Sequence, residues 1–130
     1  MRALRQVVSN KGSAGVDGMP VAALRAHLTT NRERIESALR SGTYLPQAIL
    51  GVAIPKSSGK TRLLGIPTAT DRLLQQAVGQ AIAIKFEVEF EDYSYGFRPN
   101  RNAQQAVLKA QEYINTGHRH IVDVDLKGFF

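Results

Sequence analysis

Apolar residues recur every three or four positions in three stretches of the chain, which is the spacing of amphipathic helices. These stripes predict helices over 20–40, 70–90 and 103–114, with a break expected in the first helix at 29–31. The stripe of the third helix is expected to be buried. The positions that define the stripes are Val21, Leu24, Leu28, Ile35 and Leu39 in the first, Leu74, Val78, Ile82 and Phe86 in the second, and Val107, Ala110 and Ile114 in the third.

Shorter apolar runs without helical spacing predict strands. The runs 48–54 and 61–66 are joined by a short polar segment with a glycine, 57–60, and together they predict an antiparallel hairpin. The run 121–126 is rich in β-branched residues and predicts a last strand. Because neighbouring residues of a strand point to opposite faces, two acidic residues of this run, two positions apart, would share one face.

The segments 9–18 and 93–99 are rich in glycine, proline and polar residues, and they are predicted to be loops. Either Thr70 or Asp71 can cap the start of the second helix. The predicted order is helix, hairpin, helix, helix and strand. This order, without internal repeats, favours a single unit of the α+β class, with helices packed against a β-hairpin.

The composition narrows the classes of function. The chain has 130 residues and a net charge of +6, from 17 Lys and Arg against 11 Asp and Glu, which favours a polyanionic partner. It has no cysteine, which excludes disulfides, thiolate zinc sites and thiol nucleophiles. No apolar run approaches the ~18 residues of a membrane span, and the N-terminus does not resemble a secretory signal. A reducing cytosol is compatible with these features.

Three cations surround the predicted hairpin turn. Lys56, Lys60 and Arg62 would project from one end of a tight hairpin and could hold phosphates. A solvated turn that protects a sheet edge is the more common explanation when such a cluster is taken alone. The tetrapeptide 58–61 looks like the end of a P-loop, but Ile54 stands where that motif has its first glycine, and a strand follows it. A P-loop nucleotide hydrolase is therefore excluded.

Arginine and aromatic residues gather in the second predicted loop. Arg98 and Arg101 lie beside Tyr93, Tyr95 and Phe97 in the sequence. This combination suits nucleic acid, because aromatic rings stack on bases and arginine pairs with phosphates. The alternative is structural, with Phe97 in the core and the arginines capping the acidic helix before them. The sequence favours neither alternative.

The last predicted strand carries the candidate metal ligands. Asp123 and Asp125 would lie on one face, and either both bind a metal or Asp125 binds it alone with Asp123 in support. Hard oxygen ligands without cysteine favour Mg²⁺ or Mn²⁺. His118 and His120 are better explained as solvated loop residues than as further ligands.

Four blocks of the chain, in order, resemble the N-terminal part of a group II intron reverse transcriptase, or intron-encoded maturase. They are similar to the loop against the template, the fingers hairpin with its helix, the next fingers block and the first palm motif. One departure is Gln104, where the family often has His. The blocks are 11–18 (KGSAGVDG), 54–68 (IPKSSGKTRLLGIPT) followed by Asp71 and Arg72, 94–101 (SYGFRPNR) and 123–130 (DVDLKGFF).

The resemblance implies a role for individual residues. Asp125 matches the first catalytic aspartate, which coordinates both metal ions, and the Leu126 carbonyl matches the backbone ligand beside it. Phe130 matches the aromatic that packs under the incoming sugar. Lys56 and Arg62 match the pair that holds the incoming triphosphate. The residues implied to contact nucleic acid are Lys11, Lys60, Arg72, Arg98 and Arg101.

The resemblance also implies an organisation and an activity. We expect a template-side loop or extension over 1–19, a fingers subdomain over 20–118 and the first strand of a truncated palm over 119–130. The parent enzyme would be a bacterial cytoplasmic RNA-directed DNA polymerase that uses Mg²⁺ or Mn²⁺, an RNA template, intron RNA, a DNA primer and deoxynucleotides, without a membrane partner. The family's Tyr-x-Asp-Asp motif is absent from the chain, so we expect the chain alone to be inactive and to bind no metal.

Two other classes of function stay open. One is a non-catalytic RNA-binding maturase module that assists intron splicing. The other is a structural piece that self-associates, as a homodimer, through surface that further chain would cover.

Overall fold

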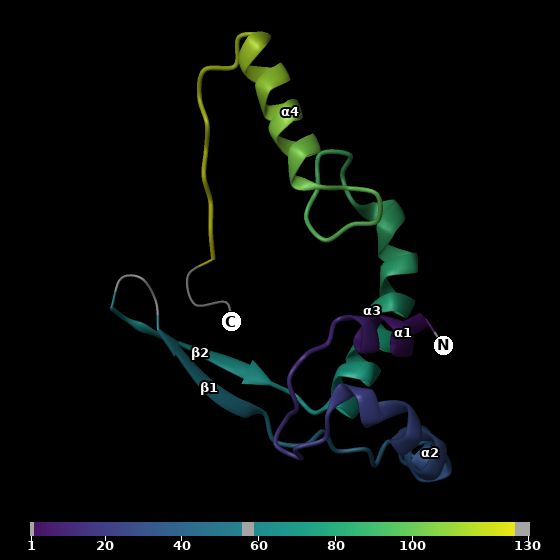
Figure 1. Ribbon diagram of the computed structural model, residues 1–130. Coiled ribbons are helices and arrows are strands. Elements are labelled where there is room, and N and C mark those ends of the chain that lie inside the picture. The colour runs from purple at the N-terminus through teal and green to yellow at the C-terminus, as the bar shows by residue number, and fades with distance from the viewer. Residues whose placement is uncertain (1, 56–58, 127–130) are drawn as a thin grey trace. The chain divides into compact units, whose positions relative to one another are not determined.

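The computed structural model describes residues 2–55 and 59–126 of the chain (Figure 1). The described part is α+β, as predicted, with helices and one two-stranded antiparallel sheet. It divides into two compact units, 1–84 and 85–130. The expected subdomain boundaries at 19 and 118 stay predictions. The elements are α1 (Arg2–Ser9), η1 (Val21–Ala23), α2 (Leu24–Arg40), β1 (Leu50–Pro55), β2 (Thr61–Ile66), α3 (Ala69–Phe86), η2 (Glu87–Glu89) and α4 (Ala103–Asn115).

The core of the first unit is small and lies between α1, η1 and the start of α3. Leu4 and Val7 of α1 pack there with Val21, Leu24 and Ala69. The sequence pattern does not predict helix α1, whose residues lie in the expected loop or extension over 1–19. A helix of 8 residues is marginal by itself, and α1 is stabilised by burying one face in this core.

Helix α2 runs through the segment where a break was expected. The hydroxyls of Thr29 and Thr30 donate to carbonyls one turn back, at 3.1 and 3.3 Å. The Asn31 amide donates to the His27 carbonyl at 3.0 Å. Because these polar side chains bond to their own helix and do not compete with it, the predicted break is wrong.

The hairpin agrees with its prediction. Leu50 pairs with Ile66 at the base, and Pro55 pairs with Thr61 next to the connection. Every residue of β1 and nearly every residue of β2 is exposed. A two-stranded sheet is marginally stable in water, so the position of this hairpin depends on what holds its base.

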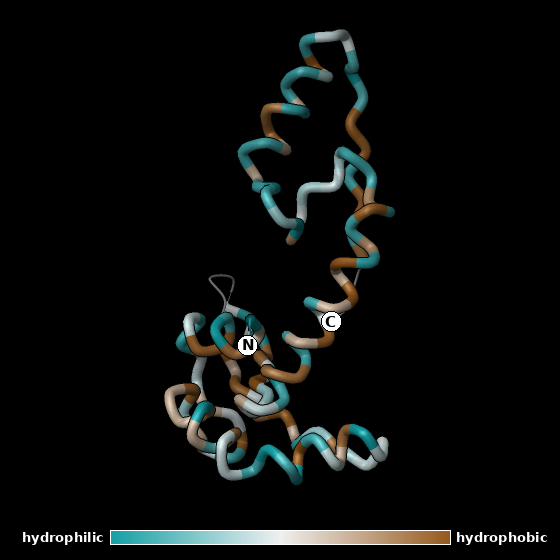
Figure 2. The backbone as a smooth tube through the Cα atoms, turned by 90° about the vertical axis from the view of Figure 1, so that its right-hand side faces the viewer, coloured by the Kyte–Doolittle hydropathy of each residue, from teal (hydrophilic) through white to brown (hydrophobic). Residues whose placement is uncertain are grey.

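The apolar stripes of α3 and α4 are less buried than their spacing suggests. Val78 and Ile82 of α3 are 57% and 49% exposed, and Val107 and Ile114 of α4 are 67% and 51% exposed. Figure 2 shows hydrophobic residues recurring along both helices. The expected burial of Val107, Ala110 and Ile114 is wrong for the described residues, because no other described element covers this face of α4. Helix α4 itself begins where predicted, with a capping box between Asn102 and Gln105.

The last predicted strand is not formed. Residues 118–126 have neither helical nor strand structure, and Ile121, Val122 and Val124 are about four-fifths exposed (83%, 84% and 79%). A strand requires a hydrogen-bonded neighbour, and within the described residues this segment has none. Among all the residues that the structure describes, no helix is long and apolar enough to cross a membrane.

Candidate nucleotide and nucleic-acid interface

The far end of the hairpin presents two of the three predicted cations. Arg62 stands opposite Ile54 in the ladder, one pair from its end, and Lys60 immediately precedes β2. Both side chains are exposed, and neither forms an ion pair with an acid in the part of the chain that the structure describes. Lys56 lies outside the described residues. The geometry therefore leaves Lys60 and Arg62 accessible to a phosphate.

The glycine-rich loop lies against the turn between β2 and α3. Gly15 is buried, and a Cβ there would meet the backbone of Thr68 at 2.7 Å from its Cα. Glycine is thus required at this position by close approach of two backbones. Arg72 donates from Nη2 to the Ser13 carbonyl at 2.6 Å, which fastens the same loop to α3. Lys11 is exposed at the start of the loop, with a left-handed φ of 47°.

Asp71, in the first turn of α3, is buried at 4% exposure. Its carboxylate accepts hydrogen bonds from the Thr68 hydroxyl at 2.6 Å, the Tyr44 hydroxyl at 2.7 Å and the backbone amide of Gln47 at 3.2 Å. The Thr68 hydroxyl in turn accepts from the Asp71 amide at 3.1 Å. Thr68 is therefore the cap of α3, and the prediction of Thr70 or Asp71 in that role is wrong.

The network perturbs the acidity of both of its ionisable members. Burial raises the pKa of Asp71, but the hydrogen bonds from Thr68, Tyr44 and Gln47 outweigh burial and bring this pKa below its ordinary value. Burial, followed by the hydrogen bond to Asp71, raises the pKa of Tyr44 to about 12, although Arg34 acts in the opposite direction. Around neutral pH the pair is thus a carboxylate and a neutral phenol.

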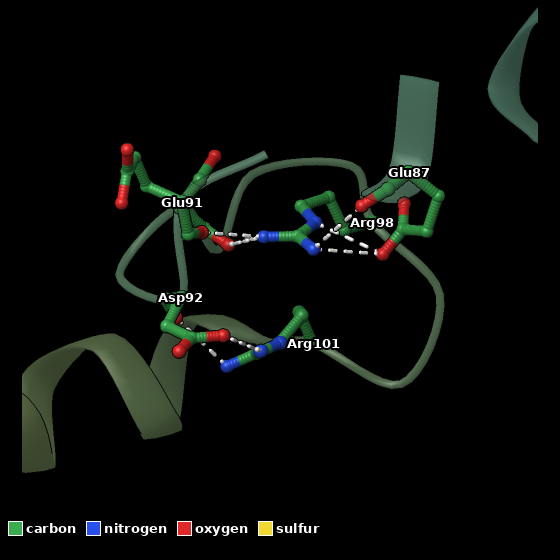
Figure 3. A network of polar contacts seen from close by, with 6 residues as sticks. Glu87, Glu91, Asp92, Arg98 and Arg101 are labelled. Atoms are coloured by element: carbon green, nitrogen blue, oxygen red, sulfur yellow. Dashed lines mark hydrogen bonds and ion pairs between the residues drawn. The ribbon is translucent and has the colours of Figure 1, made fainter. Parts of the chain in front are cut away.

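Arg98 uses its whole guanidinium inside the second unit (Figure 3). Its side chain is 8% exposed and pairs with the Glu87 carboxylate through Nε at 3.0 Å and Nη2 at 2.9 Å. It also donates to the carbonyls of Glu91 at 2.7 Å, Ser94 at 3.1 Å and Glu87 at 3.3 Å. These contacts match the five donors of the group. Arg98 therefore organises the loop after η2, and its contact with nucleic acid stays a prediction.

Arg101 and Phe97 are more accessible than Arg98. Arg101 is 30% exposed and donates to the Asp92 carbonyl at 3.0 Å (Figure 3). Its guanidinium also lies over the ring of Tyr95. Phe97 is fully exposed and has a left-handed φ of 55°. The expectation that Phe97 fills the core is wrong for the described residues, whereas its stacking on a base stays a prediction.

The carboxylates near the end of the described chain are exposed. Asp125 accepts a hydrogen bond at Oδ1 from the amide of Leu126 at 2.9 Å. Asp123 is exposed as well, and because no strand forms, the two side chains are not fixed on one face. No cluster of three metal-ligating side chains occurs among the residues that the structure describes. Phe130 lies outside them.

The predicted site residues thus fall into two groups that are described separately. Lys11, Lys60, Arg62 and Arg72 belong to the first unit, and Arg98, Arg101, Asp125 and Leu126 belong to the second. Tyr44 and Thr68 were missed as parts of the site. The spacing Thr-x-x-Asp at 68–71 signals a helix cap and would have found Thr68, whereas nothing in the local sequence signals Tyr44.

Comparison with known proteins identifies relatives that are considerably longer. Protein YkfC of Escherichia coli (strain K12) is 37% identical and covers 98% of this chain, but the match spans 35% of that protein. The group II intron-encoded protein LtrA of Lactococcus lactis subsp. cremoris is 39% identical over 98% of this chain and 21% of its own length. The chain therefore spans about a third and a fifth of these curated relatives.

A family model supplies the classification. The model described as reverse transcriptase (RNA-dependent DNA polymerase) matches residues 54–130, which is more than half of the chain. The matched region takes in the end of β1, all of β2, Thr68 and Asp71 of the buried network, the Arg98 loop and Asp125. The resemblance inferred from the four sequence blocks is confirmed by this match: the chain belongs to the reverse transcriptase family.

Proposed function

We propose that the chain forms the fingers of an RNA-directed DNA polymerase of a group II intron or a related retroelement. The observation that carries this proposal is the exposed hairpin, which presents Lys60 and Arg62 and is held at its base by a buried carboxylate. In this function Arg62, with Lys56, holds the triphosphate of the incoming deoxynucleotide. Lys11, Lys60, Arg72 and Arg101 face the nucleic acid, and Arg98 supports the loop beside it.

The chemistry of the proposed reaction places Asp125 among the metal ligands. Its exposed carboxylate is the hard oxygen donor that Mg²⁺ or Mn²⁺ prefers, and the Leu126 carbonyl is a further oxygen of the same kind. Divalent metal in such a polymerase activates the primer hydroxyl and stabilises the leaving pyrophosphate. Phe130 would pack under the incoming sugar. Two donors do not complete a metal site, so the proposed reaction needs further oxygen ligands besides these two.

A primer-extension experiment tests the proposed activity. We expect the complete polymerase that carries this chain to extend a DNA primer on an RNA template, and Asp125→Asn to reduce the rate by several orders of magnitude, because one ligand of the metal is lost. The purified 130-residue chain should give no extension. Asp123→Asn is the matched control and should retain most of the activity. Equal loss in both variants would contradict the role assigned to Asp125.

Binding to nucleic acid provides a second test that does not require catalysis. The chain should bind an RNA–DNA duplex with an affinity that falls steeply with salt, because phosphate contacts release counterions. Removing two contacts with Lys11→Gln and Lys60→Gln should reduce the slope of log K against log salt by about 1.4–1.8. Arg5→Gln with Lys85→Gln has the same change in charge elsewhere and should alter the slope less. An equal reduction would contradict a specific role for Lys11 and Lys60.

The match to the reverse transcriptase family favours polymerase over the two alternatives. A splicing-only module would bind intron RNA but would tolerate Asp125→Asn without loss of its function. Self-association as a homodimer is testable by light scattering, which would report twice the mass of the chain. The proposed location is the bacterial cytoplasm, where template RNA and deoxynucleotides are both available.

A further inference from the structure

The Asp71 carboxylate links the two ends of the hairpin. Gln47 lies just before β1, and its backbone amide donates to Oδ2 of Asp71. Thr68 lies just after β2, and its hydroxyl donates to the same oxygen. One buried acceptor atom therefore holds the chain where it enters the hairpin and where it leaves it.

The same carboxylate fastens the hairpin to the helices. Tyr44, in the segment after α2, donates to Oδ1 of Asp71 at 2.7 Å, and Asp71 itself belongs to α3. Thr68 has no exposed surface, so water cannot replace its hydrogen bonds. Since the residues of the hairpin are almost all exposed, this buried network is the principal constraint on the direction in which the hairpin points.

The glycine-rich loop meets the network from the other side. Gly15 packs on the backbone of Thr68, and Arg72, next to Asp71, holds the Ser13 carbonyl. The loop expected beside the template and the hairpin expected beside the nucleotide thus share one rigid support.

We propose that Asp71 is a positioning residue that sets the direction of the hairpin, and thereby places Arg62 at the triphosphate of the incoming nucleotide and Lys60 beside the nucleic acid. This inference rests on the proposed function and goes beyond it, since Asp71 contacts neither substrate nor metal. The carboxylate accepts hydrogen bonds from three donors. Asn replaces one of its oxygens by an NH₂ group, which accepts no hydrogen bond, and removes the negative charge that strengthens the others.

Distance measurements between two spin labels test the structural part. The chain has no cysteine, so Glu33→Cys on α2 and Leu63→Cys on β2 introduce the label sites, both at exposed positions of the first unit. We expect a narrow distance distribution in this labelled parent. Asp71→Asn and Thr68→Val should broaden or shift it, whereas Thr68→Ser, which keeps the hydroxyl, should not. Glu36→Gln, a matched loss of an exposed carboxylate on α2, should leave it unchanged.

Kinetics of the complete polymerase that carries this chain test the functional part. Asp71→Asn should raise KM for the deoxynucleotide on the order of tenfold or more and change kcat less, because the phosphate-holding cations are misplaced while the reacting groups stay intact. Thr68→Val should also raise KM, whereas the separate variant Thr68→Ser should keep the parental KM. Circular dichroism establishes that each variant retains its helices.

The possible outcomes separate the two proposals. An unchanged distance distribution in both Asp71→Asn and Thr68→Val would overturn the role of the network. A broadened distribution with an unchanged KM would overturn nucleotide positioning while leaving the proposed polymerase intact. Absence of any primer extension by the parental enzyme would overturn the proposed function, and the positioning role with it, whatever the spin labels report.

Discussion

Replacing Arg98 by Met should open the loop between η2 and α4. Met keeps an unbranched apolar stem but has no hydrogen-bond donors, so the Glu87 carboxylate and the carbonyls of Glu91 and Ser94 lose their shared partner. Arg101, which donates to the Asp92 carbonyl, and the edge-on contact of Tyr93 with Tyr113 also hold this segment, but no side chain of α4 is buried among the described residues. Polar contacts centred on Arg98, and not an apolar core, therefore organise the loop, and the substitution removes their centre.

The structure gives the size of the effect. Breaking a buried ion pair costs about 3–5 kcal/mol, and the lower end applies here because the Glu87 side chain is 34% exposed and can be rehydrated. We expect a loss of about 3 kcal/mol in the local free energy of unfolding. Arg98→Lys keeps the charge but not the planar fork, and should lose about 1–2 kcal/mol.

Native-state hydrogen exchange is the appropriate assay. The Ser94 amide donates to Glu91 at 3.0 Å and the Arg101 amide donates to Arg98 at 3.3 Å, and both bonds depend on the closed loop. A loss of ~3 kcal/mol corresponds to roughly a hundredfold lower protection. Arg32→Met is the matched control, because that arginine is 74% exposed in a surface ion pair and should cost at most about 0.5 kcal/mol. Similar protection in Arg98→Met and Arg32→Met would refute the reasoning.

Four further predictions concern the pH dependence of stability at Tyr44 and at Asp71, a glycine and a strained residue. Because the pKa of Tyr44 is raised to about 12, its contribution to stability is present below about pH 10 and is lost as the pH rises toward 12. This alkaline loss is at most about 2.7 kcal/mol, and less for a part-exposed ring. Tyr44→Phe should remove it, as measured by urea unfolding at pH 8 and 11. The pKa of Asp71 is lowered, so its contribution to stability is present above about pH 4 and is lost below it. Asp71→Asn should therefore reduce the loss of stability on acidification. Gly15→Ala should cost about 1–3 kcal/mol in urea unfolding, whereas Gly79→Ala, whose Cβ meets nothing within 4 Å, should be neutral or stabilising; equal effects would contradict the close contact at Gly15. Phe97→Asn should relieve left-handed strain by about 1 kcal/mol and increase amide protection in its loop, and a decrease would mean that the exposed ring is packed in solution.

Periodicity and turn residues were sufficient for the elements whose stability is local. Helix α4 carries its own capping box, and the hairpin carries a glycine-containing connection between two apolar runs. Helix α1 was missed because its stability comes from burying Leu4 and Val7 against residues far along the chain. The strand predicted over 121–126 failed for the converse reason, since alternation indicates which face a strand would bury and not whether a neighbour exists.

The candidate site was predictable where chemistry is visible in the residue type. Exposed cations such as Lys60 and Arg62 follow from charge and from a turn nearby. The buried Asp71 network does not follow, because Tyr44 reaches it from 27 positions away in the sequence. Arg98 shows where the sequence left two alternatives open, since a basic residue beside aromatics suits nucleic acid as well as fold support, and only the structure shows that its donors bond to carbonyls of its own loop.

The contact between Gly15 and the backbone of Thr68 has a consequence for recombination between relatives. A hairpin exchanged together with this turn and Arg72, over 50–72, would bring a turn shaped for a different loop. The smallest segment that can be exchanged without a mismatch extends from the glycine-rich loop through Arg72, because Gly15 packs on the turn and Ser13 accepts a hydrogen bond from Arg72. Chimeras with a relative of 39% identity should therefore fold when the crossover lies after Arg72, and fail when it lies between the loop and the hairpin.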